Sequence, residues 1–127
     1  GFVGPVGALW IGVAAGVGCF FAATTVKRAL GYDDSLDVFG VHCVGGIIGA
    51  LLTGVFALKA IGGASGALEG NVGQIWTQIE GVAVTLAWSG IVTLVILIVV
   101  NMLIGVRVSQ AVEVEGLDIN LHGEVVQ

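Results

Sequence analysis

The chain has 127 residues, of which 57% are hydrophobic and only 10% charged, and its mean hydropathy is +1.07. Soluble domains carry about 25% charged residues. The composition therefore excludes an ordinary water-soluble globule, and we expect a lipid bilayer to surround much of the chain. The formal net charge of −5, with four lysines and arginines in all, also argues against nucleic-acid binding.

Three long segments carry no aspartate, glutamate, lysine or arginine, and they cover residues 6–26, 38–58 and 81–106. A helix needs about 20 apolar residues to cross the hydrocarbon layer of a membrane. We therefore expect an all-α membrane protein, with three transmembrane helices in residues 1–106 and a polar tail over residues 107–127. The third segment is apolar on all sides, which is typical of a helix that faces lipid.

The basic residues predict an orientation. Lys27 and Arg28 lie between the first two segments and Arg107 follows the third, whereas Lys59 alone lies on the other side. Because basic loops stay in the cytoplasm, we expect a multi-pass protein of the cell membrane whose first loop and C-terminus are cytoplasmic.

Small residues recur at four-residue intervals in the first two segments, a spacing that lets helices approach closely. They are Ala8, Gly12 and Gly16, then Gly46, Ala50 and Gly54, and also Gly45 and Gly49. Between these segments, Gly31 is a candidate C-cap, and Asp34 and Ser35 are candidate N-caps of the second helix. Cys19 and Cys43 lie inside the apolar segments, where we expect free, buried thiols.

His42 is the most informative residue, because it is the only ionisable group of the second segment besides the Cys43 thiol. An ionisable residue within a membrane segment is by default a functional-site hypothesis. On a helix it shares a face with few bulky side chains. The members of this face are Phe39, Gly45, Gly46, Gly49, Thr53 and Phe56.

The spacing leaves two readings of that face open. Another helix can fill the groove, with His42 as a structural hydrogen-bonding residue, or the groove can form a narrow passage. In the second reading His42 is uncharged at rest, and its two ring nitrogens donate and accept protons.

We expect no metal and no cofactor at His42. Asp37 is five residues away, Cys43 points about 100° around the helix, and His122 lies in the tail. A histidine and aspartate pair within a membrane is a third, enzymatic reading, but no nucleophilic serine lies near it. We therefore do not expect an enzyme.

The tail alternates apolar and polar residues at Leu117, Ile119 and Leu121, which favours an extended segment that docks on another surface. Gly116 and Gly123 flank it and permit turns.

Four stretches together resemble the ammonium transporter family (Amt/MEP/Rh). The stretch DDSLDVFGVHCVGGIIGALLTGVF is similar to the penultimate membrane helix, whose family pattern is D-V-F-G-V-H-G-V-G-G. GFVGPVGALWIGVAAG resembles the preceding helix, WSGIVTLVILIVVNMLIGVRV the last helix, and EGLDINLHGE the cytoplasmic tail. The resemblance covers essentially the whole chain, in order. Cys43 departs from it, because the family usually has glycine there.

The resemblance implies that the chain is the C-terminal part of an eleven-helix transporter, and its start at Gly1 without methionine fits this expectation. Family members form homotrimers, and each protomer has a hydrophobic pore in which two histidines face each other. His42 matches the second histidine, and Asp37 matches the acid that opens its helix. The implied substrate is ammonium or ammonia, which passes after deprotonation of ammonium.

An alternative treats the chain mainly as trimer scaffold and regulatory segment. The tail resembles family segments that contact PII-type signalling proteins. The residues that the resemblance assigns to this contact are Gly116, Leu117, Asp118, His122 and Gly123. The tail ends HGEVVQ where relatives often continue with alanine and tyrosine.

Overall fold

The computed structural model describes residues 1–123, and the expected tail residues 124–127 lie outside this range. The described chain is helical, apart from an isolated antiparallel bridge between Val3 and Ala57. It divides into two units, Gly1–Leu86 and Ala87–Gln127, and each is described by itself.

The first helix is continuous over Pro5–Leu30. It consists of α1 (Pro5–Phe21), the π-helical turn η1 (Ala22–Val26) and α2 (Lys27–Leu30). Pro5 occupies the first turn, where the missing N–H of proline costs nothing. Gly31 ends the helix in the left-handed conformation with φ 62°, and this confirms the predicted C-cap.

The second helix extends over Phe39–Phe56 and joins the π-helical turn η2 (Phe39–Cys43) to α3 (Val44–Phe56). Its first amides are capped by Asp34, because the backbone N–H groups of Val38 and Phe39 each donate to the Asp34 carboxylate at 2.9 Å. Of the two candidate N-caps, Asp34 therefore fills this role.

A glycine-rich connection follows α3. It contains α4 (Lys59–Gly62) and the 3₁₀ turn η3 (Ala67–Glu69). The Lys59 amide donates to the Glu69 carboxylate at 2.8 Å, which fixes the loop against the start of α4. At Gly66 a side chain would meet the Val55 carbonyl at 2.6 Å, so the backbone passes too closely for any other residue.

The third helix, α5 (Gly73–Leu103), begins before the predicted position 81 and ends before 106. The sequence-based bounds followed the charge at Glu80, whereas backbone hydrogen bonding continues through polar residues at a helix end. Its first turns pack on α3, where a side chain on Gly54 would lie 3.2 Å from the Ile75 Cα.

The tail contains α6 (Gln110–Glu115) and a π-helical turn η4 (Asp118–His122). The prediction of an extended segment at 117–121 is therefore wrong. Alternation of apolar and polar residues over so few positions does not separate an extended segment from a single helical turn. Gly116 and Gly123 have φ of 112° and 66°, as the predicted turns require.

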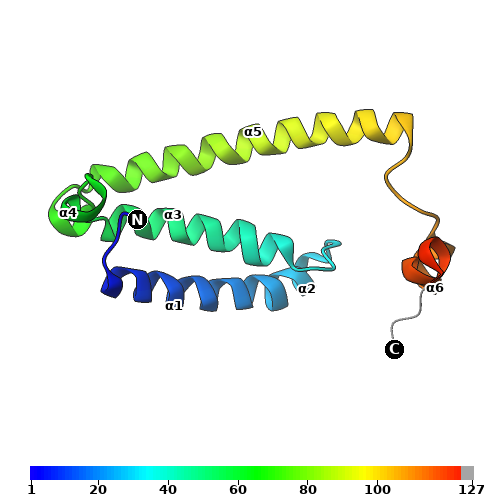
Figure 1. Cartoon of the computed structure of the whole chain (residues 1–127), viewed down its shortest axis with the longest axis horizontal. Coiled ribbons are helices and arrows are strands. Elements are labelled where there is room, and N and C mark those ends of the chain that lie inside the picture. The colour runs from blue at the N-terminus through cyan, green and yellow to red at the C-terminus, as the bar shows by residue number, and fades with distance from the viewer. Residues whose placement is uncertain (124–127) are drawn as a thin grey trace. The chain divides into compact units, whose positions relative to one another are not determined.

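In the first unit α1 and α3 lie side by side (Figure 1). Four glycines allow this approach, because a side chain on any of them would collide with, or press on, the facing helix. The pairs are Gly7 with Phe56, Gly18 with Ile48, Gly40 with Ala23, and Gly45 with Cys19. Space is open at Gly12 and Gly16, so the predicted small-residue stripe of the first helix does not form this contact.

Few side chains of the described residues are buried. Ala22 and Ala57 are the buried apolar residues, at 4% and 2% exposure, whereas large apolar side chains are exposed along all three long helices. Three helices are long and apolar enough to cross a membrane, namely Pro5–Leu30, Phe39–Phe56 and Gly73–Leu103. The expectation of an all-α chain with three such helices is confirmed.

Candidate functional site

His42 lies in the π-helical turn η2. The turn is one residue wider than an α-helical turn, and the Val44 N–H donates to the Phe39 carbonyl across five residues. Single π turns within helices are frequent at functional sites. The His42 side chain is exposed, and its imidazole makes no hydrogen bond to any residue of 1–123. No residue of 1–123 therefore supplies the hydrogen bond that a purely structural role of His42 would need.

The glycines on the predicted face of His42 fall into two groups. A side chain on Gly46 or Gly49 would meet no atom within 4 Å. Gly45 differs, because a Cβ there would lie 2.9 Å from the Cys19 sulfur, so it serves the contact with α1. The open part of the predicted groove therefore runs along Gly46 and Gly49, and Gly45 lies at its edge.

Two members of the predicted face, Thr53 and Phe39, have local partners. The Thr53 hydroxyl donates to the Gly49 carbonyl at 2.7 Å, which satisfies it within its own helix. Phe39 is 47% exposed, and its ring meets that of Tyr32 edge to face at 5.5 Å. Both side chains thus have a contact within this chain.

Cys19 and Cys43 are free thiols of intermediate exposure. The Cys19 thiol donates to the Val41 carbonyl at 3.4 Å, within the range for sulfur. This bond joins α1 to η2 one residue before His42. Among residues 1–123, no three histidine, cysteine, aspartate or glutamate side chains gather in a way that would hold a metal ion.

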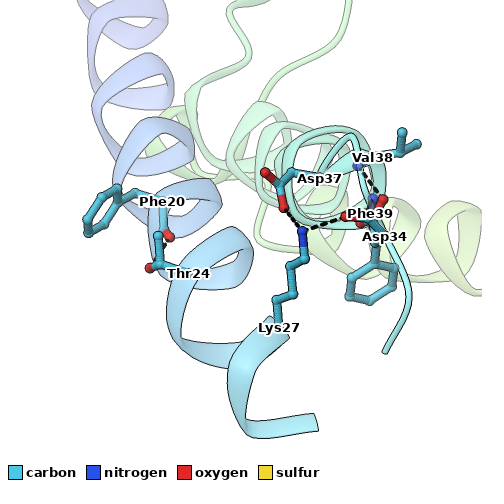
Figure 2. Close-up of polar contacts among 7 residues, drawn as sticks. All are labelled: Phe20, Thr24, Lys27, Asp34, Asp37, Val38 and Phe39. Carbon is cyan, nitrogen blue, oxygen red and sulfur yellow. Dashed lines mark hydrogen bonds and ion pairs between the residues drawn. The ribbon is translucent and has the colours of Figure 1, made fainter. Parts of the chain in front are cut away.

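Asp37 is placed by an ion pair that the sequence did not predict. The Lys27 ammonium group donates to the Asp37 carboxylate at 2.6 Å and also to the Asp34 carbonyl (Figure 2). Asp37 is the one non-glycine residue of 1–123 with positive φ, at 55°. That conformation costs about 1–3 kcal/mol, although aspartate tolerates it better than most residues.

The Asp37 carbonyl then accepts the Val41 N–H at 2.8 Å, so the residue begins the helix that carries His42. Sequence reasoning missed Lys27 because it is ten positions before Asp37. No helical or strand periodicity links two residues across a turn of that length.

The opposite π turn is stabilised locally. Thr24 lies in η1, and its hydroxyl donates to the Phe20 carbonyl at 2.6 Å (Figure 2). Threonine bonds of this kind occupy a carbonyl and accompany helix distortion. The wide turn of the first helix thus directly precedes Lys27.

In the second unit, the tail residues of the predicted regulatory contact lie in or directly beside the short element η4. Leu117 precedes η4, Asp118 lies in its first turn and His122 in its last. Upstream, Arg107 pairs with Glu113 at 2.9 Å and 3.3 Å through two guanidinium nitrogens. This pair connects the segment after α5 to α6.

The comparisons with known proteins all point to one family. Residues 1–127 match the model of the Ammonium Transporter Family. The chain is 52% identical over 124 residues to an "Ammonium transporter" of Aquifex aeolicus, covering 98% of this chain and 29% of that protein. An "Ammonium transporter" of Bacillus subtilis is 40% identical over 126 residues, with 98% and 31% covered.

A solved structure is similar as well. The crystal structure of Saccharomyces cerevisiae Mep2 superposes with a TM-score of 0.77 at 34% identity, covering 87% of this chain and 27% of that one. The chain therefore spans 31% or less of the length of these three relatives.

Proposed function

The chain belongs to the ammonium transporter family, and we propose that it forms part of a pore that carries ammonium or ammonia across a membrane. The similar bacterial proteins bear the name ammonium transporter, which describes a transport protein and not an enzyme. The exposed apolar surface of the three long helices fits a bilayer environment. This part of the chain supplies the C-terminal three helices of an eleven-helix transporter, followed by a tail.

The observation that carries the proposal is the exposed, unpartnered imidazole of His42 together with the open space at Gly46 and Gly49. A narrow apolar passage rejects the ammonium cation, because a bare charge is costly away from water. A neutral imidazole donates a proton at one nitrogen and accepts one at the other. His42 therefore acts as the second pore histidine, opposite a first histidine from the other half of the protein.

The remaining site residues shape this passage. Gly46 and Gly49 keep the space beside His42 free, while Thr53 and Phe39 line it at intermediate and exposed positions. Gly45 sets the distance between α3 and α1. Asp37 begins the pore helix.

The basic loop at Lys27 and Arg28 and the segment after Arg107 face the cytoplasm of the cell in this proposal. The protein is a multi-pass component of the cell membrane and assembles as a homotrimer, with one pore in each protomer. The proposal of a homotrimer rests on the family resemblance.

The positive φ of Gly116 and Gly123 favours a second role for the tail. These glycines enclose η4 as a compact unit with exposed Leu117 and His122. In this role the unit docks on the cytoplasmic face of the transporter and presents a surface to a PII-type regulator.

The test of the pore function uses the full-length transporter that contains this chain, reconstituted as quantified trimers. His42→Leu keeps the volume of the side chain but removes both nitrogens, so it should abolish the current that accompanies ammonium uptake. His42→Glu keeps a proton-active group and should retain part of the current with altered selectivity. Wild-type current in well-folded His42→Leu trimers would rule out a proton relay at this residue.

A further inference from the structure

The first two helices each contain a π-helical turn, and the two turns lie against each other. The turns are η1 (Ala22–Val26) and η2 (Phe39–Cys43). Their backbones approach closely at Gly40, where a Cβ would lie 2.8 Å from the Ala23 nitrogen. A contact this close between two backbones tolerates little rotation of either turn.

The direction of the His42 side chain depends on the wide turn. A π turn holds one residue more than an α turn. If η2 relaxed to α-helix, the residues of this turn would rotate by about 100° relative to α3. The direction of His42 relative to the face that carries Gly46 and Gly49 would then change. Something must therefore hold the start of the helix while η2 keeps its extra residue.

The Asp34 cap holds the first amides, but it belongs to the same loop and can turn with them. Lys27 comes from the other helix. Its ammonium group binds both acceptors that flank the start of the turn, the Asp34 carbonyl and the Asp37 carboxylate (Figure 2). The Asp37 carbonyl in turn accepts the Val41 N–H, so the bond to Lys27 acts on the residue that holds the Val41 amide of η2.

We propose that Lys27 is a positioning residue for His42, which fastens the start of the pore helix to the end of the preceding helix and so preserves the π-helical register of residues 39–43. The effect on transport rests on the proposed pore function. The effect on register rests on the contacts of Lys27 alone. Arg28 provides the matched control, because it carries the same charge at the next position and its side chain is exposed.

The first test of the helical register is amide hydrogen exchange in the full-length transporter, measured on proteolytic peptides that cover residues 38–46. Lys27→Met and Asp37→Asn should each speed exchange of these amides about tenfold, because each removes a charge-assisted hydrogen bond. The double variant should exchange no faster than either single one, since both remove the same bond. Arg28→Met should exchange at the wild-type rate, and Lys27→Arg should restore most of the protection.

Wild-type exchange in Lys27→Met would overturn the proposal. If Lys27→Met does not assemble, Asp37→Asn becomes the test of the proposal. Asparagine tolerates positive φ, so this variant removes only the charge. Wild-type exchange in Asp37→Asn would likewise overturn it.

Transport is measured on the same variants. Lys27→Met should lower the maximal current about tenfold and leave the half-saturating ammonium concentration within about twofold, because passage and not initial binding is affected. Lys27→Arg should recover much of the current, whereas a general loss of folding would lower the trimer yield in both.

Failure of this proposal is distinguishable from failure of the pore function. Fast exchange in Lys27→Met together with wild-type current in His42→Leu would leave the register role intact and remove the relay. Unchanged exchange in Lys27→Met together with loss of current in His42→Leu would remove the register role and leave the relay intact.

Discussion

Gly40 lies so close to Ala23 that a methyl group on Gly40 would come within 2.8 Å of the Ala23 backbone nitrogen. The neighbouring atoms are the main-chain nitrogen, Cα and Cβ of Ala23 in another helix, which cannot rotate away as a long flexible side chain would. The contact brings the helix of His42 to its place beside the first helix. It therefore allows a direct test of the packing on which the site depends.

Gly40→Ala should destabilise the protein by about 1–3 kcal/mol, as overpacking in a tight contact does. Thermal unfolding of the full-length protein in detergent measures the effect. Gly12→Ala is the control, because the space at Gly12 is open and alanine in a helix is otherwise favourable by up to about 1 kcal/mol. Equal melting temperatures for the two variants would show that the helices separate easily at Gly40.

Gly49→Leu should block ammonium uptake while the trimer stays folded, because the new side chain would enter the open face beside His42. Uptake by reconstituted trimers and size-exclusion chromatography measure the two properties. Gly90→Leu on α5 is the matched control, since it adds the same side chain where nothing lies within 4 Å. Unchanged uptake in a stable Gly49→Leu protein would mean that other protein atoms fill this face.

Tyr32→Phe should leave the melting temperature unchanged or raise it slightly. The Tyr32 hydroxyl is buried and has no hydrogen-bond partner among residues 1–123, so its removal relieves a desolvation cost. Phenylalanine keeps the edge-to-face contact with Phe39. Phe39→Leu, which removes that contact, should lower the melting temperature. A clear loss in Tyr32→Phe would reveal a partner for the hydroxyl elsewhere in the full-length protein.

Removal of residues 110–127 should leave the trimer assembled and abolish binding of a PII-type protein in a pull-down. The deletion eliminates α6 and η4 but none of the three long helices. Gly116→Val is a narrower variant, because valine is strained at φ 112°, and it should weaken binding without shortening the chain. Full binding by the truncated protein would contradict a docking role for the tail.

The sequence predicted the elements that depend on local chemistry. The three apolar helices follow from uninterrupted hydropathy, the end of the first helix from Gly31, and the cap of the second from Asp34. Each of these features is decided within a few residues, so a single sequence contains the necessary signal.

The choice of packing glycines needed the fold. Gly12 and Gly16 have the spacing of a contact stripe, yet the α1–α3 contact uses Gly7 and Gly18. Spacing shows which small residues share a face, but only the position of the second helix decides which face is used. Gly45 shows the same limit, because it belongs to the predicted groove and serves the contact with Cys19.

The Lys27–Asp37 pair and the π turns were also beyond prediction. The pair depends on how the loop returns after Gly31, and no pattern in its residues specifies that path. A π turn differs from an α turn by one residue, and helical periodicity over five positions is too short to show the difference.

The short extended segment before α1 has a mechanical consequence. The Phe2 carbonyl accepts the Leu58 N–H at 2.9 Å, and Val3 bridges Ala57, so the start of the first helix is fastened to the end of the second. Lys27 and Asp37 fasten the opposite ends. Contacts at both ends restrain the two helices against a hinge motion relative to each other. In the proposed pore, widening beside His42 would therefore come from side-chain rotation or from movement of other helices, and not from a hinge between these two.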